Sequence, residues 1–209
     1  VKDTSPVEIA ELMIGRRVEK LVEEREDNRA LSDRDIAVSL EDFRVEMPGE
    51  RVRGVDLAIR RGEILGIGGL AGQGKLGTPN GILGLYPASG RVVAEGRPLD
   101  LKKPGEALGR GMAFVSEDRR GVGLLLAACI QENIGFSARQ VNGDFLRRVG
   151  WMSFCDSPGA RAHAREMVKA LDIRCTGVGQ AAGSLSGGNQ QKVCLARALT
   201  LRPRVLFVS

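Results

Sequence analysis

A glycine-rich segment that ends in a lysine is the feature that most restricts how this chain can fold. The segment matches the pattern G-x-x-x-x-G-K, and its residues are Gly69, Leu70, Ala71, Gly72, Gln73, Gly74 and Lys75. It follows the apolar run Ile64-Leu65-Gly66-Ile67, which predicts a buried strand. Small residues let successive backbone N–H groups converge on an anion, and a lysine meets the outer phosphates. The pattern therefore predicts a phosphate-binding turn with Lys75 as its central charge.

The position after Lys75 departs from this pattern. A Ser or Thr is expected there, because its hydroxyl binds Mg²⁺, but the residue is Leu76, which offers no ligand atom. We expect Leu76 and Gly77 to complete the loop and Mg²⁺ binding to be weak or absent. The alternative at this point is an ordinary strand-to-helix turn with a fortuitous lysine.

Several further segments predict an α/β fold. Val55, Leu57 and Ile59 alternate with polar residues as in a half-buried strand. Further strand candidates lie at residues 92–94, 111–115 and 205–208, far enough apart for helices between them. This spacing favours a partly parallel sheet.

The second half of the chain has a helical pattern. Residues 127–183 predict a helical insert, in which Ser157-Pro158 begins a helix with Ala164, Met167, Val168 and Leu171 on one face. A last helix over residues 188–201 is expected to place Val193, Ala196 and Leu199 inward and to end before Pro203. Near the start of the chain, Ser5-Pro6-Val7-Glu8 predicts a short capped helix, and charged residues 19–35 indicate a linker.

Composition excludes several classes of protein. The 209 residues carry a net charge of +5, but no basic run is interleaved with aromatic residues, so we predict no nucleic-acid partner. The four cysteines form no C-x-x-C pair and indicate neither a zinc site nor a disulfide framework; Cys194 is read as a core residue. The longest uncharged run, residues 121–131, is too short to cross a bilayer, and no signal peptide opens the chain, so a cytoplasmic location is expected.

A second motif lies far along the chain and opens the last predicted helix. Its residues are Leu185-Ser186-Gly187-Gly188-Asn189-Gln190-Gln191-Lys192. The backbone N–H groups of a helix N-terminus, with a serine beside them, form a second site for phosphate. Taken alone, the motif is also compatible with a simple capped helix.

The two motifs together resemble those of ATP-binding cassette (ABC) transporter nucleotide-binding domains. The stretch Gly62 to Ile67, the segment Phe114 to Arg120 and the LSGGNQQK motif are similar to the second, C-terminal half of tandem sugar-importer subunits. This resemblance implies a P-loop NTPase (RecA-like) α/β core with an antiparallel β subdomain and a helical subdomain near residues 125–185. It implies that residues 1–35 are a linker and the end of a preceding domain. Residues 36–209 would be a partial nucleotide-binding domain, ending after the signature helix and its strand.

The resemblance also implies partners and site residues. Two such domains clamp two ATP molecules, each between the phosphate loop of one half and the signature of the other. Gly69–Gly77 would hold a nucleotide here, while Ser186, Gly187, Gly188 and Asn189 would reach the nucleotide of the partner half. The expected partners are the first half of the same subunit, membrane permease subunits and, indirectly, a solute-binding protein. The location would be peripheral at the inner face of the membrane.

Several departures from the family pattern argue against efficient hydrolysis at this loop. Leu76 removes the metal hydroxyl, and Ser209 replaces an aspartate that supports Mg²⁺. The resemblance also implies that Glu117 is a nucleotide-site residue, with its carboxylate near the metal where a glutamine is usual; the alternative is a solvent-facing turn residue. Met47 aligns with the aromatic residue that stacks on adenine, and Phe43 is only a weak substitute. His163 is expected to be a surface residue of a helix. No catalytic residue and no metal ligand is assigned.

The resemblance and these departures together favour a degenerate ATP-binding half of a carbohydrate importer that lends its signature to its partner. A structural module that binds no nucleotide is the first alternative, and an importer of nucleosides is the second. A P-loop kinase or GTPase is disfavoured, because such enzymes need a hydroxyl at position 76.

Overall fold

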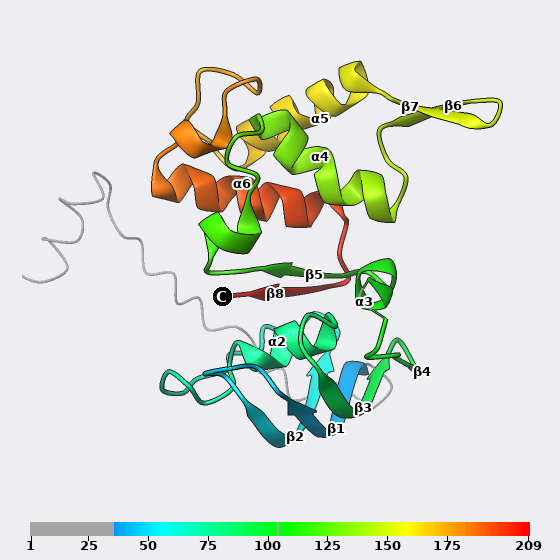
Figure 1. Cartoon of the computed structure of the whole chain (residues 1–209), viewed down its shortest axis with the longest axis vertical. Coiled ribbons are helices and arrows are strands. Elements are labelled where there is room, and N and C mark those ends of the chain that lie inside the picture. The colour runs from blue at the N-terminus through cyan, green and yellow to red at the C-terminus, as the bar shows by residue number, and fades with distance from the viewer. Residues whose placement is uncertain (1–35, 104) are drawn as a thin grey trace, which may run out of the picture. The chain divides into compact units, whose positions relative to one another are not determined.

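The computed structural model describes residues 36–103 and 105–209, and its contacts make one compact unit, Ile36–Ser209 (Figure 1). The expected N-terminal helix and the linker over residues 1–35 lie outside the described residues. The elements in chain order are β1 (Ile36–Val45), β2 (Val52–Arg60), α2 (Gly77–Ile82), β3 (Ala88–Ala94), β4 (Arg97–Pro98), α3 (Glu106–Gly109), β5 (Met112–Val115), the π-helical turn η2 (Arg119–Gly123), α4 (Ile130–Val141), β6 (Leu146–Val149), β7 (Met152–Cys155), α5 (Ser157–Ala170), the 3₁₀ turn η3 (Ala182–Ser184), α6 (Gly187–Thr200) and β8 (Val205–Val208).

An antiparallel sheet forms one layer of the unit. Its strand order is β2-β1-β3-β4, so β1 lies between β2 and β3. Val38, Leu40 and Phe43 of β1 are fully buried in a hydrophobic cluster that α2 also joins. The expected strands at residues 55–59 and 92–94 are confirmed as parts of β2 and β3.

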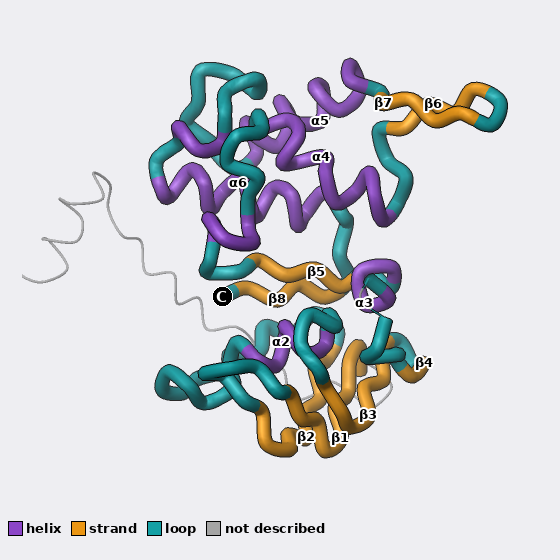
Figure 2. The backbone as a smooth tube through the Cα atoms, viewed as in Figure 1, coloured by secondary structure: helices purple, strands orange, loops and turns teal. Residues whose placement is uncertain are grey.

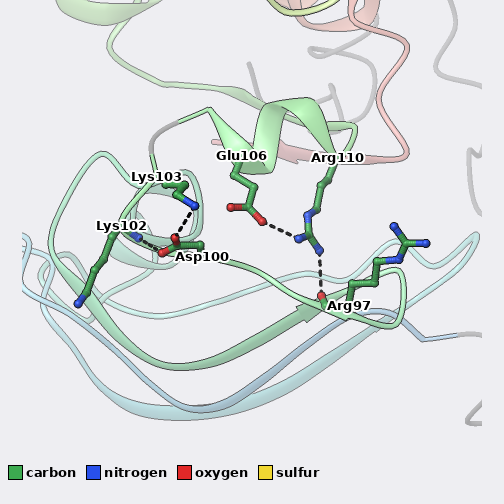
Figure 3. A network of polar contacts seen from close by, with 6 residues as sticks. All are labelled: Arg97, Asp100, Lys102, Lys103, Glu106 and Arg110. Carbon is green, nitrogen blue, oxygen red and sulfur yellow. Dashed lines mark hydrogen bonds and ion pairs between the residues drawn. The ribbon is translucent and has the colours of Figure 1, made fainter.

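The connection from β4 to β5 is tied down by polar contacts (Figure 3). The ammonium of Lys103 pairs with the Asp100 carboxylate at 3.2 Å. The Arg110 guanidinium pairs with Glu106 one helical turn before it, at 2.5 Å, and donates to the Arg97 carbonyl at 3.1 Å. The short helix α3 is thereby fastened to the end of β4.

The parallel strands β5 and β8 form a middle layer between two cores (Figures 1 and 2). Met112 and Phe114 of β5 join the hydrophobic cluster of the antiparallel sheet, whereas Ala113 and Val115 join the hydrophobic cluster of the helices. On β8 the alternation continues: Val205 and Phe207 join the first cluster, and Leu206 joins the second. These strands confirm the candidates at residues 111–115 and 205–208 and the partly parallel arrangement.

Helices α4, α5 and α6 form the other layer, as the sequence predicted. Helix α5 begins at Ser157, with Pro158 in its first turn and the Asp156 side chain accepting the Gly159 N–H. Helix α6 matches the expected last helix, and its Val193 and Cys194 are buried.

Two details of the helical layer differ from expectation. Leu199 is 36% exposed rather than inward, because i+6 from Val193 lies well off the buried face of a helix with 3.6 residues per turn. Between α4 and α5 the chain forms the β6–β7 hairpin, whose two-residue turn contains Gly150 with φ of 61°. The helical insert expected over residues 127–183 thus contains a hairpin at residues 146–155 that the sequence pattern did not predict.

The expected buried strand at residues 64–67 is also wrong. These residues have no strand assignment, and Ile64 and Ile67 are 77% and 47% exposed. A buried parallel strand needs hydrogen-bonded neighbours at both edges and apolar cover on both faces. Among the described residues no strand of the sheets has this segment as a neighbour, and Ile64, Leu65 and Ile67 line an open cleft.

Candidate functional site

The glycine-rich loop presents converging N–H groups. Gly72 and Gly74 have φ angles of 83° and 87°, in the region that side chains rarely adopt. This backbone aims the N–H groups of Gly72, Gly74 and Leu76 at a single carboxylate. An arrangement of successive N–H groups around one anion is a nest, which suits phosphate oxygens.

The carboxylate in this nest belongs to Glu50. Its Oε1 accepts the N–H of Gly72 at 2.7 Å, and its Oε2 accepts those of Gly74 at 2.8 Å and Leu76 at 3.4 Å. Glu50 is only 8% exposed. The Gly72 N–H, helped by the other two and by the charge of Lys75, holds the pKa of this carboxyl below its ordinary value, although desolvation acts in the opposite direction. Its two oxygens are thus the acceptors of all three converging N–H groups.

Sequence reasoning missed Glu50. The residue lies more than twenty positions before the loop that it contacts, and no motif joins the two. The only local signal is a turn: Pro48 and Gly49, with φ of 77° at the glycine, precede Glu50, whose N–H donates to the Met47 carbonyl at 3.1 Å. Proline followed by glycine at the centre is typical of a tight turn, but it does not indicate where the Glu50 side chain points.

Lys75 is partly buried and turns back onto its own loop. Its ammonium donates to the Gly69 carbonyl at 2.7 Å. Lys75 also lines a cleft of about 780 Å³, and the predicted site residues Ala71, Leu76 and Glu117 line the same cleft. The structure thus brings together part of the predicted set, and Ser209 also lines the cleft. Leu70 and Gln73 are exposed, and neither is among the lining residues.

The donor groups around the loop suit phosphate better than a divalent cation. Leu76 has no ligand atom, and the nearest hydroxyl along the helix, that of Thr78, is buried and donates to the Gly74 carbonyl at 3.1 Å. Among the described residues no three His, Cys, Asp or Glu side chains gather as metal ligands do. Mg²⁺ prefers several oxygen ligands in near-octahedral geometry, and the loop's own side chains do not offer them.

The signature residues lie at the N-terminus of α6. Ser186 is the N-cap residue, and Ser186, Gly187 and Gly188 are exposed. The Ser186 hydroxyl accepts the Asn189 side-chain N–H at 2.9 Å, so it makes no capping bond to the helix backbone. Arg119 from η2 donates to the Gly187 carbonyl at 2.6 Å. Asn189 thus holds the Ser186 side chain, and the exposed N-terminus of α6 has no side-chain cap.

The two candidates for stacking on adenine do not line the cleft of the loop. Phe43 is fully buried in the core, so it cannot stack on a base, and Met47 lines a second cleft of about 630 Å³ rather than the cleft of the loop. Glu117 lines both clefts.

His163 is not a simple surface residue: its ring packs on Phe145 and its Nε2 lies 3.0 Å from the Thr200 hydroxyl. None of the described helices is both long and apolar enough to pass through a membrane.

Known proteins resemble this chain over its whole length. The ribose import ATP-binding protein RbsA 2 of Rhizobium meliloti (strain 1021) is 33% identical over 210 residues, which cover 100% of this chain and 38% of that protein. The galactofuranose transporter ATP-binding protein YtfR of Escherichia coli (strain K12) is 32% identical over 203 residues, covering 97% of this chain and 38% of that protein. The chain thus spans well under half the length of these curated relatives.

Solved structures match at the level of the fold. A dimeric ATP-binding cassette in a post-hydrolysis state, bound to ADP and Pi, is 24% identical with a TM-score of 0.65, covering 82% of this chain and 72% of that one. The cbiO1 protein of Clostridium perfringens, part of the ABC transporter complex cbiONQ, is 21% identical with a TM-score of 0.60, covering 83% and 65%. The family model described as ABC transporter matches residues 52–208. The chain therefore belongs to the ABC transporter family and has the α/β fold of its ATP-binding cassettes, with a P-loop NTPase core and an antiparallel β subdomain.

Proposed function

We propose that this chain is an ATP-binding part of a carbohydrate importer, namely its second, degenerate half. Relatives named for ribose and galactofuranose transport support the carbohydrate class. The proposed partners are the first half of the same subunit and membrane permease subunits, with a solute-binding protein acting through the permease. The proposed location is peripheral, at the inner face of the membrane. Residues 1–35 would link the two halves, and residues 36–209 would be the nucleotide-binding part.

One observation carries the nucleotide proposal: three N–H groups of the glycine-rich loop converge on an anion. A phosphate of ATP would accept the same N–H groups of Gly72, Gly74 and Leu76. The Lys75 ammonium would leave the Gly69 carbonyl for a phosphate oxygen, exchanging a neutral acceptor for a charged one. ATP supplies the phosphoanhydride bond whose cleavage energises transport, whereas this chain's residues hold and orient its phosphates.

The proposal that this half is degenerate rests on its lack of side-chain ligands for Mg²⁺. Leu76 and the buried, internally bonded Thr78 hydroxyl leave the loop without a side-chain ligand for Mg²⁺. Ser209, which lines the cleft, is a poorer partner for a hard cation than a carboxylate. We infer binding of nucleotide with little hydrolysis at this loop.

The signature would serve the partner's nucleotide. The exposed Ser186, Gly187 and Gly188 sit at the positive end of the fourteen-residue helix α6, which favours an anionic γ-phosphate. The Arg119 contact to the Gly187 carbonyl fixes the turn η2 against this end. An intact signature beside a metal-poor loop is the arrangement that this division of roles requires.

A titration with ATP, with and without Mg²⁺, tests the nucleotide proposal. By isothermal calorimetry we expect saturable binding that Mg²⁺ changes little and that Lys75→Ala weakens about tenfold or more, because a charge-assisted contact to phosphate is lost. Lys102→Ala is the matched control, since Lys102 is an exposed lysine away from the loop, and it should bind as the unaltered chain does. Equal binding by Lys75→Ala and the unaltered chain would refute the assignment of the loop.

A second candidate function is a structural module that binds no nucleotide. The Glu50 carboxylate already satisfies the N–H groups that a phosphate needs, and this observation favours it. The two candidates separate when Glu50 is replaced: a module without a nucleotide role gains no ATP binding from the change.

A further inference from the structure

The loop and the turn before β2 are built around each other. A Cβ at Gly77 would lie 2.1 Å from the Glu50 carbonyl oxygen, and one at Gly74 would lie 2.9 Å from that of Arg51. A Cβ at Gly72 would lie 3.2 Å from the Gly49 carbonyl oxygen. Contacts this close to backbone exclude a side chain at Gly77 and Gly74. The glycines of this loop therefore serve the approach of Glu50 as well as the approach of a phosphate.

The Glu50 side chain and a nucleotide phosphate need the same donors. The Gly72 and Gly74 N–H groups each point at a Glu50 oxygen at normal hydrogen-bond distance, and the Gly74 residue is buried. Two anions cannot occupy the same acceptor position, because their oxygen atoms would overlap and their like charges repel at contact distance. Phosphate can therefore enter only if the carboxylate leaves.

We propose that Glu50 is an internal occupant of the phosphate loop, an autoinhibitory contact that nucleotide must displace. The inference rests on the proposed function, since it concerns regulation of the same site. In the resting loop both charged groups are satisfied internally: Glu50 by backbone N–H groups and Lys75 by the Gly69 carbonyl. A bound nucleotide would replace both of these contacts with contacts to its phosphates. The turn Met47–Glu50 keeps the Glu50 backbone in place, so the displacement requires rotation of the side chain only.

The variant Glu50→Gln tests the displacement. The amide keeps the size of the side chain but places an NH₂ donor against N–H donors, so it cannot fill the nest as the carboxylate does. Isothermal calorimetry with ATP and with inorganic pyrophosphate should show about tenfold or more tighter binding than in the unaltered chain. Glu50→Asp keeps the charge on a shorter arm and should lie between the two.

The matched control is Glu46→Gln, which makes the same change of charge four residues earlier. Glu46 pairs with Arg51 on the surface, and both side chains are more than half exposed. This control should bind as the unaltered chain does. A rise in affinity as large in Glu46→Gln as in Glu50→Gln would overturn the inference, because it would reduce the effect to net charge.

A second readout, made without nucleotide, keeps the inference apart from the proposed function. Amide hydrogen exchange should show protection at Gly72 and Gly74 in the unaltered chain and its loss, by about tenfold or more, in Glu50→Gln. Equal exchange in both proteins overturns the inference whatever ATP does. Protection by Glu50 together with no ATP binding in any variant overturns both the displacement and the proposed nucleotide role. If Glu50→Gln and the unaltered chain bind ATP with equal affinity, and Lys75→Ala loses this binding, the inference is overturned but the proposed nucleotide role is not.

Discussion

At the scale of single residues, we expect Glu50 to affect the folding stability of the protein as well as the affinity of the loop for nucleotide. A buried carboxylate that accepts three N–H groups stabilises the folded state in its charged form. Without it, the N–H groups of the loop would lose their acceptor; Gly74 is buried, and an unsatisfied buried donor costs about 1–3 kcal/mol. The contact that we propose nucleotide must displace thus also stabilises the conformation of the loop.

The contribution of Glu50 should depend on pH. The Gly72 N–H and its neighbours lower the pKa of this carboxyl from its ordinary value of 4.5. A lowered pKa in the folded state contributes stability that is fully present above the unfolded pKa and is lost as pH falls through the folded pKa. We therefore expect the difference in unfolding free energy between the unaltered chain and Glu50→Gln to be largest at pH 7 and to shrink below the pKa of an unfolded glutamate.

Urea unfolding followed by circular dichroism, repeated over a series of pH values from neutral to acid, measures this difference. The control Glu46→Gln should lose little at any pH, since exposed ion pairs contribute about 0–1 kcal/mol. A gap between Glu50→Gln and the unaltered chain that stays constant down to acid pH would contradict the prediction.

At the scale of elements, one guanidinium joins three parts of the helical layer. Arg197 of α6 donates to the Ser137 hydroxyl of α4 at 2.8 Å and to the Gly123 carbonyl of η2 at 2.9 Å, and it lies 5.1 Å from the centre of the Phe136 ring. Burial lowers the pKa of Arg197. The planar guanidinium of an arginine can donate hydrogen bonds in two directions at once, as the two acceptors of Arg197 require. The ammonium of a lysine is a single compact charge instead.

Arg197→Lys should therefore destabilise the fold by about 1–3 kcal/mol, because at least one partly buried acceptor loses its charged donor. The free energy of unfolding in urea provides the measurement. Arg165→Lys is the control on α5, where the side chain is exposed, and it should change stability by about 0.5 kcal/mol or less. Equal stability of the two variants would show that the Arg197 contacts contribute nothing net.

At the scale of the whole described unit, the β5–β8 pair belongs to both hydrophobic clusters. Alternate side chains of the same two short strands face opposite cores, so neither core can open without exposing one face of the pair. This shared layer favours a single cooperative unfolding transition.

The prediction is that damage to one core loosens the other. Phe43 lies fully buried in the cluster with the antiparallel sheet, and Phe43→Ala should cost about 3–5 kcal/mol. Cys194 is buried in the opposite cluster, and its labelling by a thiol reagent, located by mass spectrometry, should accelerate in Phe43→Ala. Trp151→Ala is the control, because this side chain is 93% exposed on the β6–β7 hairpin. Unchanged Cys194 labelling in Phe43→Ala would indicate that the two cores unfold separately.

Local patterns in the sequence were sufficient for much of this protein. The alternation at Val55, Leu57 and Ile59, the helix start at Ser157-Pro158 and the last helix all depend on neighbours within a few residues, and each was found where it was predicted. The family could likewise be inferred from two short motifs, because phosphate-binding loops need specific residues at fixed spacing.

Tertiary contacts decided the rest. Ile64 to Ile67 has the composition of a buried strand, yet a strand forms only when other segments supply partners at its edges and cover for its faces. Glu50 gives no sign of its role in its own surroundings, because its three donors come from residues more than twenty positions later. The sequence alone determined that this chain carries a loop built for an anion. Only the tertiary structure, by folding a distant turn against that loop, decided which anion of the protein itself lies there.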